Sequence, residues 1–318
     1  MKLSELYKRA IATGIDYDPR GRDAVIKELE ERRKRYEDLK PREKETFDIG
    51  TLENPYSDSR ILFGSGDEDI NSVMVGIDID VGEILLAETL RNKNKAIDLL
   101  ISHHPGGIAF GNLSAVMYMQ AEILQRFGVP VNIAECLMEG RAEEVARRLM
   151  PANHARSADA ARLLAIPFMC LHTPADNMVA NYLQNLFEDK KPYRLEDIIA
   201  LLRDIPEYRD AEKYNAGPKV LLGSDKRKAG KIFVDMTGGT EGAKDVLQSL
   251  SLSGINTIVG MHMSEEHRKE AEQHHINVVI AGHIASDTLG MNMLFDRIIG
   301  DEKIDVLECS GFKRIARN

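Results

Sequence analysis

Residues 97–107, IDLLISHHPGG, join a short apolar run to two histidines, a proline and two glycines. The apolar run predicts a buried strand. Neighbouring side chains on a strand point to opposite faces, so His103 and His104 serve one pocket only where the strand ends and the backbone turns. Pro105 favours an extended backbone at His104, and Gly106 and Gly107 allow the chain to turn sharply after the strand. The segment therefore indicates a metal site at a strand end; the alternative is a histidine pair that binds nothing.

Outward from this segment, short β-branched runs alternate with helical stretches, which predicts βαβ units and a largely parallel or mixed sheet. A second such series fills the C-terminal half, where INVVIAGH (276–283) repeats the pattern of an apolar run that ends in histidine. We therefore expect an α/β protein of two similar lobes with the metal site in the cleft between them. Alternatively, the two halves share no special relationship, and their similarity is the general similarity of any two βαβ units.

Patterning along the chain predicts its division into lobes. The charged segment 1–48 reads as a helical N-terminal extension. Within it, KELEERRKRYEDLKPREKE (27–45) is expected to form a solvated helix that packs one thin stripe onto the body, and the alternative is a partner-binding arm. Residues 129–165 read as a helical insertion, except that VPVNIAE (129–135) is expected to form a strand. The first α/β lobe then comprises residues 49–128 and 166–215, and the second comprises residues 216–318.

The charge balance limits the classes of partner. The 318 residues include 42 Lys and Arg against 51 Asp and Glu, a formal net charge of −9, so no basic surface is evident for nucleic acid or an anionic membrane. The cysteines Cys136, Cys170 and Cys309 are too few and too scattered for a disulfide framework or a thiolate zinc site. The sequence shows no signal peptide or membrane-spanning apolar run, so we expect a cytoplasmic protein with small-molecule or protein partners.

The segment HTPAD places a histidine, His172, and a carboxylate at another expected strand exit. Pro174 suits the first turn of a helix, which would place Thr173 and Asp176 around that turn. A Thr-x-x-Asp pair there resembles a helix capping box, which needs no metal. A metal site and a capped helix are both open interpretations of this segment.

A third strand exit carries His283 and Asp287, four residues apart where a helix is expected to begin after Gly282. That spacing places both side chains on one face of the first turn and suits two ligands of one ion. His262 and Asp78 occupy matching positions just beyond strand ends in the two halves. Each either lines the pocket or is an ordinary hydrogen-bonded side chain.

Two further features do not point directly to a metal. His267, His274 and His275 lie in a charged helical stretch and are expected to be solvated. The segment TGGTEG (237–242) joins a strand to a helix and either presents backbone N–H groups to a phosphate or forms a plain tight turn. It lacks the glycine spacing of the known dinucleotide and nucleotide loops.

Taken in order, ISHHP, HTPAD and AGHIASD resemble the motifs of the Nif-three-like dinuclear metal family, also known as GTP cyclohydrolase I type two homologues. The similarity covers residues 49–128 and 166–312. The resemblance implies two divalent ions of Zn, Fe, Mn, Co or Ni, with Asp176 bridging them. The ligands that it implies are His103, His104, Asp176, His283 and Asp287. It also implies a ring-shaped homohexamer.

The function that follows is metal-dependent hydrolysis of a small nucleotide-like, phosphoester or cyclic amide substrate by a metal-bridging hydroxide. His172 and His262 are then the candidate catalytic proton carriers. The alternative is a non-catalytic protein that stores, delivers or senses metal, or an assembly scaffold. The family pattern has Glu where this chain has Asp287, and the shorter side chain leaves open whether one ion or two is held.

Overall fold

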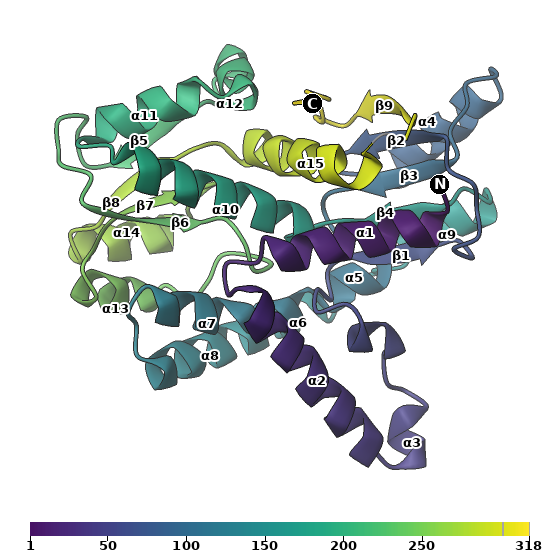
Figure 1. Ribbon diagram of the computed structural model, residues 1–318, viewed down its shortest axis with the longest axis horizontal. Helices are drawn as coiled ribbons and strands as arrows, with labels where there is room; N and C mark the ends of the chain where they lie inside the picture. The colour runs from purple at the N-terminus through teal and green to yellow at the C-terminus, as the bar shows by residue number, and fades with distance from the viewer. Residues whose placement is uncertain (301, 318) are drawn as a thin grey trace.

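The computed structural model describes residues 1–300 and 302–317, and its strands form two sheets (Figure 1). The first sheet contains β1 (Arg60–Phe63), β2 (Ser72–Gly76), β3 (Leu99–Ser102), β4 (Phe168–Cys170) and β9 (Asp305–Cys309). The second contains β5 (Lys219–Leu222), β6 (Lys231–Asp235), β7 (Ile255–Gly260) and β8 (Asn277–Ile280).

The strand orders are β1-β4-β3-β2-β9 and β5-β8-β7-β6. Neighbouring strands are parallel except for the antiparallel pairs β1 with β4 and β5 with β8. The expected α/β fold with two largely parallel sheets is therefore confirmed. Strands β2, β3 and β8 are buried along their whole length, which explains why they read as continuous apolar runs rather than alternating ones.

Helices cover the faces of both sheets (Figure 1). They are α1 (Leu3–Asp16), α2 (Arg22–Asp38), α3 (Pro41–Lys44), α4 (Val81–Arg91), α5 (Gly107–Gly111), α6 (Leu113–Val116), α7 (Met119–Arg126), α8 (Val131–Leu149), α9 (Arg156–Leu163), α10 (Thr173–Lys190), α11 (Leu195–Arg203), α12 (Pro206–Ala211), α13 (Val246–Leu252), α14 (Glu265–Gln273) and α15 (His283–Ile299). Two short 3₁₀ helices are η1 (Ile49–Leu52) and η2 (Glu212–Tyr214). Within the described ranges, no helix is both long enough and apolar enough to cross a membrane.

Helices α10 and α15 lie side by side and belong to the cores of both sheets (Figure 1). In α10, Met178 packs in the core of the first sheet and Leu183 in the core of the second. In α15 the order is reversed, because Leu289 packs with the second sheet and Phe295 with the first. The beginnings of both helices are thereby held between the two sheets.

Residues 129–135 do not form the expected strand, because α8 begins at Val131. The alternation of apolar and polar residues there is only local. Over the full segment the buried side chains recur at helical spacing, which favours a helix packed by one face: Ala134, Met138, Ala142 and Val145.

Both ends of the chain pack against the first sheet. Strand β9 follows the second sheet in sequence, but it pairs with β2 of the first sheet and covers an edge that would otherwise be open. Helix α1 buries Leu3, Leu6 and Ala10 in the core of the first sheet, whereas the charged helix α2 buries Val25 and Leu29. The lobe boundaries near residues 129, 166 and 216 stay a prediction.

Candidate metal centre

The candidate ligands lie where parallel strands end, the usual location of sites in open α/β sheets. His103 and His104 follow β3. Their backbone N–H groups donate to the carbonyl oxygens of Gly76 (3.0 Å), the last residue of β2, and of Ile77 (2.9 Å), the residue after it. The chain thus stays in register with β2 for two residues after the strand before it turns. His172 follows β4 and precedes α10, and α15 begins at His283, as expected.

Ligand atoms from these strand ends form three overlapping groups, each with its atoms within 4.8 Å of one another. The groups are His103 with His104 and His172; His104 with His283 and Asp287; and His103 with Asp176 and Asp287. The structure thus brings together all five ligands that the resemblance implies. It adds His172 to the same cluster.

His103 is buried and presents one ring nitrogen to the carboxylates. Its Nδ1 lies 3.2 Å from the carbonyl oxygen of Leu171; because a carbonyl only accepts, this contact assigns the proton to Nδ1. Nε2 then carries the free electron pair, 3.4 Å from Oδ1 of Asp176 and 3.6 Å from Oδ1 of Asp287. Burial and the neighbouring imidazoles lower the pKa of His103 to about 3, so the ring is neutral and free to bind a metal.

His104 connects the buried cluster to an exposed carboxylate. Its Nδ1 lies 2.7 Å from Oδ1 of Asp78, and its Nε2 lies 3.5 Å from Oδ2 of Asp287. Burial lowers the pKa of His104, but the two carboxylates outweigh that effect and raise it. From the sequence, Asp78 was expected either to line the pocket or to be an ordinary hydrogen-bonded side chain. In the structure its carboxylate orients the imidazole of His104.

Three oxygens of the buried carboxylates accept no hydrogen bond from the described residues. Among the described residues, no hydrogen bond reaches Oδ1 of Asp176 or either oxygen of Asp287, and a buried carboxylate without a partner is costly. Burial and the nearby carboxylates raise the pKa of Asp176 to about 8. Burial also raises the pKa of Asp287, but the surrounding imidazoles have the larger effect and lower that pKa.

This donor set fits divalent cations. Imidazole nitrogens and carboxylate oxygens without thiolates suit Zn, Fe, Mn, Co or Ni and do not select among them. Cations would also supply the missing partners of the buried carboxylates. The cluster is therefore a group of buried His and Asp side chains that could hold metal ions.

The capping-box interpretation of HTPAD is wrong. The side chain of Thr173 donates to Oδ2 of Asp58 at 2.6 Å instead of capping the helix. The residue that caps α10 is His172, which makes no side-chain capping bond. Asp176 therefore points into the cluster.

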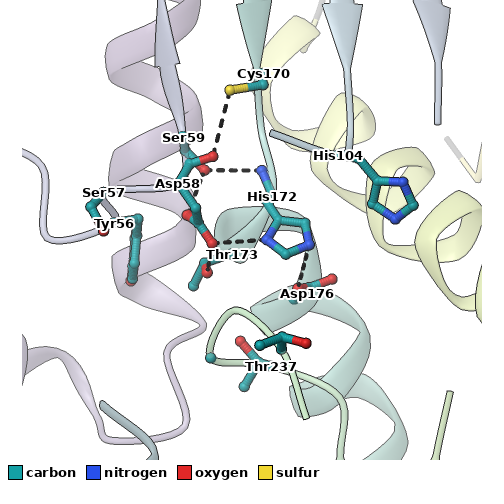
Figure 2. A network of polar contacts seen from close by, with 12 residues as sticks. Tyr56, Ser57, Asp58, Ser59, His104, Cys170, His172, Thr173, Asp176 and Thr237 are labelled. Carbon is teal, nitrogen blue, oxygen red and sulfur yellow. Dashed lines mark hydrogen bonds and ion pairs between the residues drawn. The ribbon is translucent and has the colours of Figure 1, made fainter. Parts of the chain in front are cut away.

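Asp58, which no sequence motif indicated, supports His172 from outside the cluster (Figure 2). Its Oδ2 lies 2.8 Å from Nδ1 of His172, and the hydroxyl of Ser59 accepts the backbone N–H of His172 at 2.9 Å. Nε2 of His172 is thereby directed toward Asp176, 3.7 Å from its Oδ2. Burial lowers the pKa of His172, but Asp176 and Asp58 outweigh it and raise the pKa to about 9.

A cavity of about 760 Å³ opens beside the cluster. One wall carries His104, His172 and Asp287, and the opposite wall is formed by β6, residues 237–243 and α7. His262 also lines the cavity, and its ring centroid lies 4.8 Å from that of His283. It belongs to none of the three ligand groups found in the described ranges, and its catalytic role stays a prediction.

His267 is not simply solvated, contrary to expectation. Its Nε2 lies 2.9 Å from the carbonyl oxygen of Gly242, and its Nδ1 lies 2.7 Å from the hydroxyl of Ser264. The side chain therefore connects α14 to the loop that follows β6.

This chain is similar to known proteins at the level of solved structures. No family model matches the sequence, and no curated protein matches it. A NIF3 superfamily protein from Sphaerobacter thermophilus aligns with 80% of this chain and 91% of its own length, with 29% identity and a TM-score of 0.70. The chain is NIF3-like. The predicted resemblance to the Nif-three-like family is thereby confirmed.

Two further solved structures are less similar to this NIF3-like chain than the Sphaerobacter protein is. Reduced HcgD from Methanocaldococcus jannaschii has a TM-score of 0.47 at 13% identity, over 79% of this chain and 87% of that one. TTHA1606 from Thermus thermophilus has a TM-score of 0.44 at 14% identity, over 79% and 86% of the two chains. The assignment of the NIF3-like fold depends on the Sphaerobacter protein.

Proposed function

We propose that this NIF3-like protein binds two divalent metal ions and uses them to hydrolyse a small molecule held in the adjoining cavity. The observation that carries the proposal is the set of three buried carboxylate oxygens without partners among the described residues, on Asp176 and Asp287. They lie among imidazole nitrogens at the edge of a cavity large enough for a small substrate. Such an arrangement is costly in a protein without cations.

In this proposal, Asp287 is the best-placed shared ligand. Its oxygens lie 3.6 Å from Nε2 of His103, 3.5 Å from Nε2 of His104 and 3.6 Å from Nε2 of His283. It belongs to two of the three ligand groups, whereas Asp176, the bridge implied by the resemblance, belongs to one. The short side chain therefore does not argue against a second ion.

Divalent ions bound here would polarise a substrate and lower the pKa of water. The residues of the chain supply positioning and proton transfer. His172, held by Asp58, directs Nε2 toward the cluster and the cavity. Its contact with Asp58 favours the protonated imidazole, which makes His172 the candidate that donates a proton to a leaving group. His262, on the cavity wall, is the second candidate proton carrier.

The first experiment measures metal content in protein purified without added metal, followed by a hydrolysis screen of nucleotides, phosphoesters and cyclic amides. We expect two ions per chain, loss of hydrolysis after chelation and recovery when metal is returned. Unchanged turnover in metal-free protein would contradict the proposal. Rapid transfer of the ions to an apoprotein, with no substrate converted, would instead support a metal-delivery role.

The homohexamer implied by the resemblance is part of the proposal as well. Light scattering coupled to size-exclusion chromatography measures the mass in solution. A mass of six chains is expected, and a monomer would contradict the ring.

A further inference from the structure

The loop that follows β6 leaves its backbone donors without partners. Among the described residues, no acceptor is present for the backbone N–H groups of residues 237–245. Gly238 in this run is buried, and most of its neighbours are at least half-buried. Buried backbone N–H groups are nearly always paired with protein, water or ligand. The loop therefore calls for acceptors from outside the chain.

The carbonyl groups of the same loop are, by contrast, held by side chains. Nε2 of Gln120, itself buried, donates to the carbonyl oxygens of Gly238 at 2.6 Å and Thr240 at 2.8 Å. The other two contacts are from Arg141 Nε to the carbonyl oxygen of Glu241 at 3.0 Å and from His267 Nε2 to that of Gly242 at 2.9 Å.

These contacts fix the direction of the free donors. No peptide bond in the described ranges is cis, and the C=O and N–H of a trans peptide unit point in opposite directions. Each held carbonyl therefore turns the N–H of its own peptide unit away from the side chain that holds it. The donors concerned belong to Gly239, Glu241, Gly242 and Ala243.

Glycine is required for this backbone path. The φ angles of Gly238 and Gly239 are +98° and +90°, values that residues with a side chain rarely adopt. A Cβ on Gly238 would lie 2.6 Å from Gln120 Cγ, and one on Gly239 would lie 2.8 Å from Val116 Cγ1. The two glycines thus allow the loop to pack directly on α6 and α7.

The loop lies on the wall of the cavity that contains the metal cluster. At its start, the hydroxyl of Thr237 donates to Oδ1 of Asn177 at 2.6 Å, and Asn177 is the residue after Asp176. Figure 2 shows Thr237 close to Asp176. A ligand bound at the loop therefore reaches the cluster without leaving the cavity.

Charged side chains of both signs line the cavity. Arg126 and Lys231 line the cavity, and neither forms an ion pair within residues 1–300 and 302–317. The carboxylate of Glu241 is engaged by the backbone N–H of Ser264 at 2.8 Å and by Nδ1 of His267 at 3.2 Å. Asp235 at the end of β6 is the remaining carboxylate beside the loop.

From the free donors and their place in the cavity we infer that the loop of residues 237–243 binds the phosphoryl group of a phosphorylated small substrate, whose reacting part then lies at the metal cluster. The inference rests on the proposed function for the identity of the reacting site. Several N–H donors match the three terminal oxygens of a phosphoryl group, as in other phosphate-binding loops.

The experiment titrates inorganic phosphate into the full-length protein, both metal-loaded and stripped by chelation, and follows binding by calorimetry and ³¹P NMR. Gln120→Met removes the donor that holds two loop carbonyls. We expect it to weaken phosphate binding about tenfold in both preparations, which corresponds to about 1.4 kcal/mol. The matched control is Gln184→Met, because Gln184 lines the same cavity but contacts Glu188 and β6 rather than the loop.

A second variant, Arg141→Met, removes the contact to the Glu241 carbonyl and gives an independent measurement if Gln120→Met does not fold. Phosphate binding only to metal-loaded protein, unaffected by either variant, would overturn the loop assignment while supporting the metal centre. No phosphate binding at all would also overturn it. Acetate that binds as tightly as phosphate would overturn the phosphoryl assignment, whereas metal stoichiometry tests the proposed function separately.

Discussion

Nδ1 of His172 lies 2.8 Å from Oδ2 of Asp58, a carboxylate with no exposed surface. The two residues are 114 positions apart in sequence, and the pair orients an imidazole at the edge of the metal cluster. Outer carboxylates that hold histidines in this way fix the tautomer and raise the basicity of the ring.

Asp58→Asn should lower the pKa of His172 from its raised value of about 9 toward the ordinary 6.5, because the amide removes the negative charge that favours the protonated ring. NMR titration of the histidine ring signals measures this shift. Asp98→Asn is the control, since Asp98 accepts from the backbone of Asn71 and Ser72 at the opposite end of the sheet. An unchanged His172 titration in Asp58→Asn would show that Asp58 does not act on this ring.

Substitutions of the two buried carboxylates should differ in metal stoichiometry. Asp287 belongs to two ligand groups and Asp176 to one, so we expect Asp287→Asn to lose both ions and Asp176→Asn to retain one. Elemental analysis after extensive dialysis measures the content. Asp78→Asn, which alters an exposed carboxylate that contacts only His104, should retain both. Equal losses in Asp287→Asn and Asp176→Asn would contradict the sharing of Asp287.

The metal-free protein should lose stability as the pH rises from 6.5 to about 8. Folding raises the pKa of His172 from 6.5 to about 9 and that of Asp176 from 3.8 to about 8. In this range the folded protein holds more protons on both groups than the unfolded chain, so the free energy of unfolding falls with pH. His103, with a pKa of about 3, acts only below pH 6.5.

Denaturant unfolding at several pH values, in the presence of chelator, measures this slope. Asp176→Asn removes its own contribution and the carboxylate that most raises the pKa of His172, so it should flatten the dependence. A stability that rises between pH 6.5 and 8 in metal-free wild type would contradict the assignment of these raised pKa values.

Gly290→Ala should lower the free energy of unfolding by about 1–3 kcal/mol, the usual cost when an added methyl group forces the backbone of a packed core to shift. A Cβ on Gly290 of α15 would lie 2.4 Å from the carbonyl oxygen of Ala175 in α10, next to Asp176. Gly140→Ala in α8 is the matched control, because nothing lies within 4 Å of its Cβ; it should stabilise by about 0.5–1 kcal/mol. Thermal and denaturant unfolding compare the two, and equal effects would rule out this close helix contact.

Asp235→Asn should tighten phosphate binding about threefold, because it removes a negative charge on the cavity wall beside the loop. The surrounding protein and Glu241 raise the pKa of Asp235 to about 6, so the charge is present at pH 8 and smaller at pH 5.5. Calorimetry at both pH values should show the larger gain at pH 8. Asp189→Asn, an exposed change outside the cavity, should leave the affinity unaltered.

The sequence predicted those site residues that directly follow an apolar run. Each of His103, His172 and His283 follows a run that forms a buried strand, and parallel strands bring such ends together. Asp58 could not be found in this way, because it contacts His172 only through the tertiary fold and no motif marks it. The loop of residues 237–242 was ambiguous, since its free donors depend on side chains far away in sequence, such as Gln120.

Errors in the secondary structure have a similar origin. The alternation in VPVNIAE is equally compatible with a strand or a helix over so few residues, and only the buried stripe of the complete α8 decides between them.

Because α10 and α15 each pack into the cores of both sheets, the two halves of the molecule have no hinge between them. Opening the cluster by a rigid rotation of one sheet against the other would expose apolar side chains of α10 and α15, such as Leu183 and Phe295, that pack in one core or the other. We therefore expect a small molecule to enter and leave the cavity by local movement of its loops, with the arrangement of the His and Asp cluster unchanged. Thermal unfolding of the two sheets should accordingly occur as a single cooperative event.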